Sequence, residues 1–108
     1  MSSRRGRASD LDLTAVIGTT AELDDWQFEI GATLQIPSGS SITTIIWYTS
    51  HNGTDYARAQ KDGADWAAVA VDASAEAKSI DVPAELFGAL HIKPLADASG
   101  TVGCSFKN

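Results

Sequence analysis

The sequence predicts an all-β, single-domain fold: a β-sandwich or jelly-roll-like arrangement with one short helical turn and a flexible N-terminal arm. Three observations support this: a long stretch of alternating apolar and polar residues, further runs of β-branched and aromatic residues, and turn signals between them. At 108 residues the chain has the usual length of one domain. We assign residues 1–9 to the arm and 10–108 to the β-domain.

The clearest strand lies between residues 26 and 36. Apolar side chains occupy every second position, and polar or small side chains occupy the positions between them. A period of two places one set against a core and the other in water, whereas a helix would scatter both sets. Gly31 at its centre suggests a bulge or bend. The residues expected to face the core are Trp26, Phe28, Ile30, Ala32, Leu34 and Ile36.

The last strand alternates in the same way, with Val102, Cys104 and Phe106 expected to face inward. The run 42–48 is β-branched and aromatic on both faces, which is typical of a central strand or of one covered by a partner.

Weaker patterns predict three more strands. The strand expected at 90–95 contains Pro94, which has no N–H to donate, so this strand must lie at a sheet edge or contain a bulge. Their expected ranges are 11–17, 66–71 and 90–95.

Turn signals separate these runs. Asn-Gly and Asp-Gly pairs tolerate the positive φ angles of tight hairpins. A short helical turn is expected to begin at Pro83 and to end at Gly88, and we expect Asp81 to cap it. The turn signals lie at 37–40, 51–54, 61–63 and 98–100.

Charge divides the chain unevenly. The net charge is −6, but three of the eight basic residues, Arg4, Arg5 and Arg7, lie in the first seven positions. The remainder has five Lys or Arg against 14 Asp or Glu, a balance of −9, which disfavours nucleic acid and anionic membranes as partners. The arm is interpreted either as a solubilising tail or as a segment that orders against an acidic partner or a neighbouring subunit.

Neither histidine is placed as a catalytic base would be. His51 precedes the Asn-Gly turn and is expected in solvent, and His91 shares a strand parity with Lys93, so it is expected to face outward. The single cysteine, Cys104, allows no internal disulfide and is expected in the core. We therefore expect no enzymatic activity.

The acidic residues do not form a recognised metal motif. Asp24 and Asp25 are adjacent, so in a strand they would point to opposite faces. Oxygen ligands for calcium could gather if two loops met, but no calcium-loop spacing is present, so we predict solvated turn residues, no metal and no cofactor. The loop residues considered are Asn52, Asp55, Asp62 and Asp65.

Two aromatic residues are candidate surface anchors. Trp26 and Trp47 lie among inward-facing residues and are expected in the core. Tyr56 follows the Asn-Gly turn and Trp66 follows the Asp-Gly turn, so either could present its ring to a sugar or a protein surface.

Several segments resemble known proteins. The stretch 47–56 followed by Lys61-Asp62-Gly63, and the stretch 82–88 followed by 90–95 and Gly100-Thr101-Val102, resemble small structural proteins of tailed phages, the decoration or cement proteins of the head. The same pattern of turns and strands is similar to galactose-binding-like jelly rolls. The likeness covers residues 45–107.

The resemblance implies a virion structural protein on the outer capsid surface. Such a protein would bind the major capsid protein, stabilise the head and form a trimer or dimer, with Arg4, Arg5 and Arg7 as candidate capsid or subunit contacts. The alternative is a carbohydrate-binding jelly-roll module of a phage fibre or baseplate, which exposed Tyr56 and Trp66 on one face would favour. A small enzyme would need a histidine buried beside a carboxylate.

Overall fold

The described residues form antiparallel sheets. The computed structural model describes residues 8–23, 31–83, 85–86 and 91–107. These residues contain no α-helix, and nothing in them is a helix long and apolar enough to cross a membrane. The predicted all-β, sandwich-like class is confirmed.

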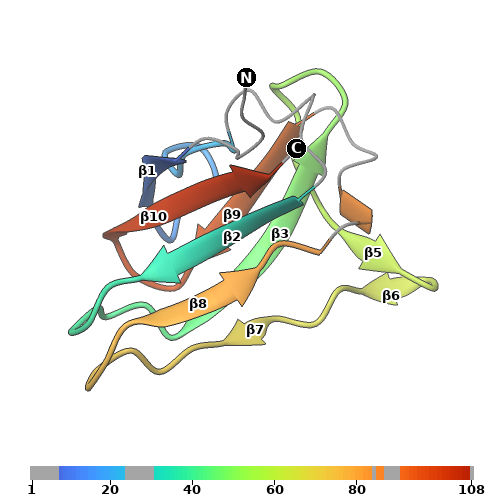
Figure 1. Ribbon diagram of the computed structural model, residues 1–108. Coiled ribbons are helices and arrows are strands. Elements are labelled where there is room, and N and C mark those ends of the chain that lie inside the picture. Colours follow the sequence, from blue (N-terminus) through green and yellow to red (C-terminus); the bar gives the residue numbers. More distant parts are fainter. Residues whose placement is uncertain (1–7, 24–30, 84, 87–90, 108) are drawn as a thin grey trace.

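Sheet A is formed by strands from both ends of the chain and from its middle. All of its neighbouring strands are antiparallel, and β10 and β2 lie in the centre, flanked by β1 and β8 (Figure 1). In spatial order the strands are β1 (Ala8–Leu13), β10 (Gly100–Lys107), β2 (Gly31–Ile36) and β8 (Lys78–Asp81).

Sheet B is built around β3 (Thr44–Ser50), which is paired along both sides. One side carries β9 (His91–Ala96), and the other carries two short strands, β4 (Ala57–Arg58) and β7 (Val69–Ala70). The central position predicted for the run 42–48 is thereby confirmed, although the strand begins and ends two residues later than predicted. Pro94 lies in β9, which pairs only with β3 among the described strands, so the expected edge position is confirmed.

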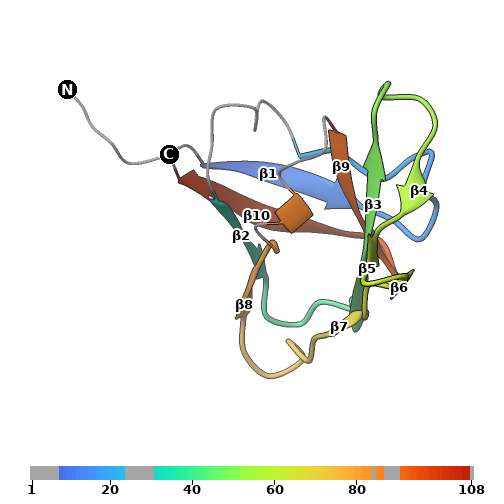
Figure 2. The same ribbon diagram turned by 90° about the vertical axis from the view of Figure 1, so that its right-hand side faces the viewer.

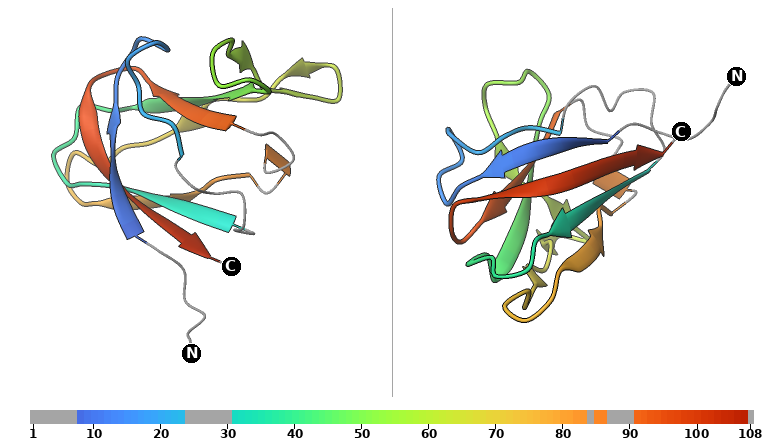
Figure 3. Two further views of the ribbon diagram at one scale, coloured as in Figure 1. Left: turned by 90° about the horizontal axis from the view of Figure 1, so that it is seen from above. Right: turned by 60° about the vertical axis from the view of Figure 1, so that its left-hand side comes forward.

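The two sheets face each other and enclose the core (Figures 2 and 3). Alternate residues of long strands such as β2 and β9 point into this space, which is why these strands show a period of two. Among the described residues, Trp47 of sheet B is the largest fully buried side chain. Sheet A contributes Leu11, Leu13, Ala32, Leu34, Ile36, Val102 and Cys104, and sheet B contributes Ile45, Trp47, Ile92, Pro94 and Ala96.

The alternation predicted for 26–36 is confirmed from Gly31 onward, where β2 buries every second side chain. It is also confirmed in β10 for Val102 and Cys104. Trp26, Phe28 and Ile30, and the side chain of Phe106, lie outside the described residues.

The prediction for the N-terminal strand was wrong at both ends. β1 begins at Ala8, inside the segment assigned to the arm, and ends at Leu13 rather than at residue 17. The chain then turns, because the amide of Thr20 donates to Val16 O and the hydroxyls of Thr14 and Thr19 bond to each other. Extended residues would leave these groups unpaired, so the turn replaces the strand.

The strand expected at 66–71 is shorter than predicted. Only Val69 and Ala70 pair with β3, while the Trp66 amide donates to Ala59 O. The sequence did not predict β8, which contains one apolar residue, Ile80.

The expected tight turn at Asp62-Gly63 joins β5 (Gln60–Lys61) to β6 (Ala64–Asp65), with φ angles of 56° and 84°. Positive φ at both positions is the geometry of a type I′ hairpin.

The helical turn is present where it was expected, since the Leu86 amide donates to Pro83 O at 3.1 Å. Asp81 is not observed as its cap. It ends β8 and accepts a hydrogen bond from the Thr33 hydroxyl of the neighbouring strand.

Candidate functional site

The outer face of sheet A is polar and acidic. Its strands alternate, so the residues between the core positions point to solvent. Asp10, Asp12 and Asp81 lie on this face, and so by register does Lys107, whose side chain is outside the described residues. The other described members are Thr33, Gln35, Ser79, Thr101 and Ser105, with Gly103 among them. We call this surface the acidic face.

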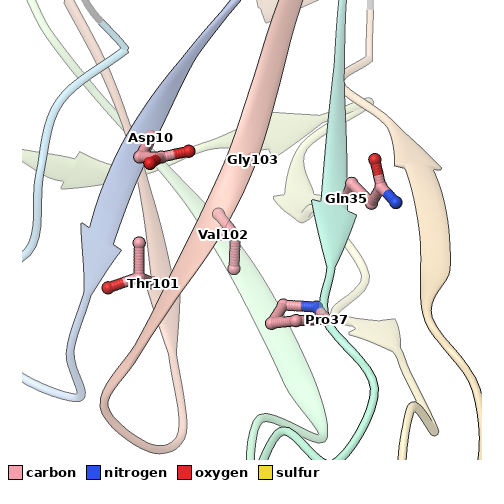
Figure 4. A pocket seen from close by; sticks show the side chains of 6 residues that line it. All are labelled: Asp10, Gln35, Pro37, Thr101, Val102 and Gly103. Atoms are coloured by element: carbon pink, nitrogen blue, oxygen red, sulfur yellow. The ribbon is translucent and has the colours of Figure 1, made fainter.

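A hollow of about 230 Å³ lies on the acidic face (Figure 4). It exists because the register places Gly103 between Asp10 of β1 and Gln35 of β2, in one row across the sheet. Glycine contributes no side chain, so the row has a gap where its neighbours project outward. Thr101 and Pro37 extend the lining along the strands.

The polar groups around the hollow differ in whether they already form hydrogen bonds. The Thr101 hydroxyl donates to Asp12 Oδ1 at 2.7 Å, so that carboxylate is held against the sheet. The Asp10 carboxylate has no hydrogen bond or ion pair among the described residues. The hollow therefore offers one available negative charge together with the Gln35 amide, which can donate and accept.

β1 is an edge strand whose outer edge is only partly covered. Asp12 O accepts a hydrogen bond from the Ala21 amide, so the backbone groups of Asp12 point away from β10. Because backbone groups alternate in direction along a strand, those of Ala8 and Asp10 point the same way. Within the described residues, β1 pairs only with β10.

A second polar group lies outside sheet B, where segment 14–23 closes the edge of β9. The amides of Ala21 and Leu23 donate to Asp12 O and Ile92 O, so this segment connects the edges of β1 and β9. Glu22 lies between these two anchors, and its carboxylate reaches His91 and Tyr56.

Both oxygens of the Glu22 carboxylate are engaged. The Tyr56 hydroxyl donates to Oε1, and His91 Nδ1 lies 2.9 Å from Oε2. A carboxylate only accepts, so Nδ1 carries the proton in this contact. Burial, followed by the hydrogen bond and negative charge of Glu22, raises the pKa of Tyr56 above its usual value. We call Glu22, Tyr56, His91 and Lys93 the tyrosine cluster.

The cluster is enclosed from two further sides. Lys93 Nζ lies 4.6 Å from the centre of the Tyr56 ring and donates to Ile17 O. Gly53 lies against the imidazole, since a Cβ at this position would be 3.2 Å from two ring atoms of His91. The cluster thus holds three separate segments together: 14–23, the loop after β3, and β9.

The expected outward orientation of His91 is correct for its strand face, but the side chain is not free in solvent. It is 29% exposed beside a carboxylate that is 33% exposed. This meets half of the condition stated for an enzyme, a histidine beside a carboxylate, and the residues that line the hollow on the acidic face are different ones. Chemically, the arrangement is a chain of hydrogen bonds that joins a phenol, a carboxylate and an imidazole.

The two aromatic anchor candidates are half-buried. Tyr56 is hydrogen-bonded to Glu22 and covered by Lys93, and Trp66 packs against the core with Lys61 Nζ 5.0 Å from its ring centre. The condition set for sugar binding, both rings exposed on one face, is therefore not met, and full burial is not observed either.

The acidic loop residues are used within their own turns. Asn52 Oδ1 accepts from the amides of Thr54 and Asp55, and Asn52 Nδ2 donates to Asp55 Oδ2. Asp65 accepts from Gln60 and lies 3.8 Å from Arg58. Over the ranges that the structure describes, no three His, Cys, Asp or Glu residues gather as metal ligands would.

The other residues considered in the sequence are either exposed or outside the described residues. His51 is exposed, as expected. Arg4, Arg5 and Arg7, and the pair Asp24 and Asp25, lie outside the described residues.

Sequence reasoning missed Glu22, Lys93 and Gly103. No local signal marks Glu22 or Lys93, because their partners lie 34 to 76 residues away. For Gly103, a glycine inside an alternating strand was a usable signal of an unfilled position.

Comparison with models of known protein families, with curated proteins and with solved structures finds no match.

Proposed function

We propose that this protein is a non-enzymatic virion structural protein, a capsid decoration or cement protein that binds the lattice of the major capsid protein and stabilises the head. The observation that carries the proposal is the position of β1. This edge strand borders the acidic face and directly follows the basic segment of Arg4, Arg5 and Arg7.

The edge of β1 offers a mode of attachment. The backbone groups of Ala8 and Asp10 point outward from the sheet, and such groups pair with an extended segment of another chain by strand addition. This pairing depends on the backbone rather than on particular side chains, so it suits a contact repeated at every position of a shell.

Opposite charges beside that edge support a lattice contact. The basic segment and the acidic face are joined through one strand, so a protein bound to a repeating surface could contact one neighbour with each. Head-to-tail contacts of this kind can repeat across a lattice. Many weak contacts acting together give a high overall affinity for the shell.

The body is suited to bearing load because connecting segments are fixed to sheet B by hydrogen bonds other than those between paired strands. Thr20 donates to Pro94 O, and Asp97 accepts from the amides of Thr43 and Thr44. In this proposal the protein lies on the outer capsid surface as a trimer or dimer and resists the outward pressure of the packaged genome.

The test is the copy number of the protein in purified virus particles, measured by quantitative mass spectrometry against the major capsid protein. One copy per capsid subunit, or a simple fraction of that, supports lattice binding. A handful of copies per particle would place the protein in the tail or a fibre, and its absence from particles would overturn the proposal.

A further inference from the structure

We propose that the hollow on the acidic face is the docking site for the basic segment of a second copy of this chain, with an arginine guanidinium seated over Gly103 between Asp10 and Gln35. This inference rests on the proposed function for its biological setting. Its physical argument depends on the shape and charge of the described residues and on the three arginines in the first seven positions of the sequence.

The size of the hollow fits one side chain better than a small-molecule ligand. At about 230 Å³ it is below the roughly 300–1,000 Å³ of typical small-molecule pockets. Neighbouring strands are about 4.8 Å apart, so Asp10 and Gln35, two strands apart, leave a gap roughly 10 Å wide above Gly103. A planar guanidinium lying in this gap can donate to the carboxylate and to the amide oxygen.

Charge favours the same occupant. The three arginines of residues 1–7 match three carboxylates on the acidic face, Asp10, Asp12 and Asp81, and no described Lys or Arg side chain competes for them there. The Asp10 carboxylate has no partner among the described residues, so docking an arginine there breaks no bond that these residues make.

The direction of β1 favours docking between copies over docking within one chain. The hollow extends from Asp10 toward Thr101, which pairs with Asp12, while the chain preceding Ala8 leaves β1 at the other end. A reverse turn takes four residues, so a turn ending at Ala8 would leave only Arg4 before it. A neighbouring copy can present all three arginines.

The experiment is sedimentation velocity of the intact chain over a concentration series, at about 50 mM and about 500 mM salt, where the Debye length falls from ~14 to ~4 Å. We expect reversible self-association that weakens with salt. The triple variant R4Q/R5Q/R7Q should raise the dissociation constant at least about tenfold, since several exposed ion pairs are lost together.

Gly103→Leu should have a comparable effect because it fills the hollow. Gly103→Ala is its matched control, since a Cβ there lies 3.7 Å from Gln35 Cβ and leaves most of the space open. Asp10→Asn tests the charge without new bulk, so the inference stays testable if the leucine variant does not fold. The double variant K61Q/K78Q, which removes two partly exposed lysines that do not lie on the acidic face, should associate like the unmodified chain.

Mixing the arginine variant with Gly103→Leu decides whether docking is between copies. One variant retains the hollow and the other retains the basic segment, so the mixture should form heterodimers although neither associates alone. A monomeric unmodified chain, association that persists in the arginine variant, or a mixture that stays monomeric would each overturn the inference.

These outcomes are separate from the copy-number test. A protein found at lattice stoichiometry that is monomeric in solution would keep the proposed function and lose the docking site. Self-association through the hollow by a protein that is absent from virus particles would keep the docking site and overturn the proposed function.

Discussion

The carboxylate of Asp97 accepts hydrogen bonds from the backbone and the hydroxyl of Thr43, 54 residues earlier in the chain. It also accepts from the Thr44 amide at 3.0 Å, so one side chain fixes the start of β3 to the turn between β9 and β10. These hydrogen bonds, that of the Thr43 hydroxyl first, lower the pKa of Asp97 to about 2.

Asp97→Ala should lower the free energy of unfolding by about 1 kcal/mol at neutral pH. Hydrogen bonds to a charged group contribute about 1.5–3 kcal/mol, and exposure of the carboxylate reduces this. Urea denaturation at pH 7 measures it. Asp72→Ala is the matched control, because among the described residues Asp72 accepts hydrogen bonds from Ser74 alone, within one turn, so its loss should have a smaller effect.

The contribution of Asp97 should disappear in acid. Its pKa in the folded state is below the usual value of about 3.9, so its stabilisation is fully present above about pH 4 and is lost as the pH falls toward 2. The difference in unfolding free energy between Asp97→Ala and the unmodified protein should therefore shrink over that range. A difference that stays constant would contradict the hydrogen-bonding role.

Removing the Tyr56 hydroxyl should weaken the link between segment 14–23 and sheet B. Tyr56→Phe should cost about 1–2 kcal/mol, because it leaves one half-buried oxygen of Glu22 without its donor. A double-mutant cycle with Glu22→Gln should show coupling, since the two residues share one interaction. Purely additive effects would contradict the contact.

The same contact predicts a delayed titration. The raised pKa of Tyr56 favours the neutral phenol in the folded state, so this stabilisation is present below about pH 10 and is lost as the pH rises above it. The tyrosinate absorbance that Tyr56→Phe removes should appear only above pH ~10. Titration of that signal at or below pH ~10 in the folded protein would contradict the prediction.

Gly53→Ala should destabilise the protein more than Gly39→Ala. Both glycines have positive φ angles, 77° and 84°, which cost an alanine roughly 1–2 kcal/mol. Only at Gly53 would the new Cβ also lie 3.2 Å from the His91 ring, whereas nothing lies within 4 Å at Gly39. Chemical denaturation of both variants gives the comparison.

The steric part of that effect can be isolated. His91→Ala removes the ring that the new methyl group would meet, so Gly53→Ala should cost less in that background, close to the value for Gly39→Ala. An equal cost in both backgrounds would show that the ring does not lie against Gly53.

Leu34→Ala should cost about 2–5 kcal/mol, because this fully buried side chain of β2 would leave a cavity between the sheets. Ser79→Ala, on the exposed face of the adjacent strand, should change the free energy by less than about 0.5 kcal/mol. Similar costs would contradict the assignment of faces in sheet A.

Local pattern was enough for much of the fold. Leu34 and Val102 face the core because each lies in an alternating run, and alternation is a property of the strand itself. The Asp62-Gly63 turn could also be predicted, because positive φ is tolerated by these residue types wherever they occur. By contrast, β8 and the end of β1 depend on which neighbouring strand supplies hydrogen bonds, and no local pattern specifies that.

The sequence by itself determined the all-β class, the burial of Trp47 and the separation of a basic N-terminal segment from an acidic body. Only the tertiary structure decided that Gly103 lies between Asp10 and Gln35, and that Glu22 meets Tyr56 and His91. The physical reason is the distance along the chain over which each kind of interaction acts. Side-chain period and charge are set by neighbours in the chain, whereas strand register and loop contacts are set by the packing of segments far apart in sequence.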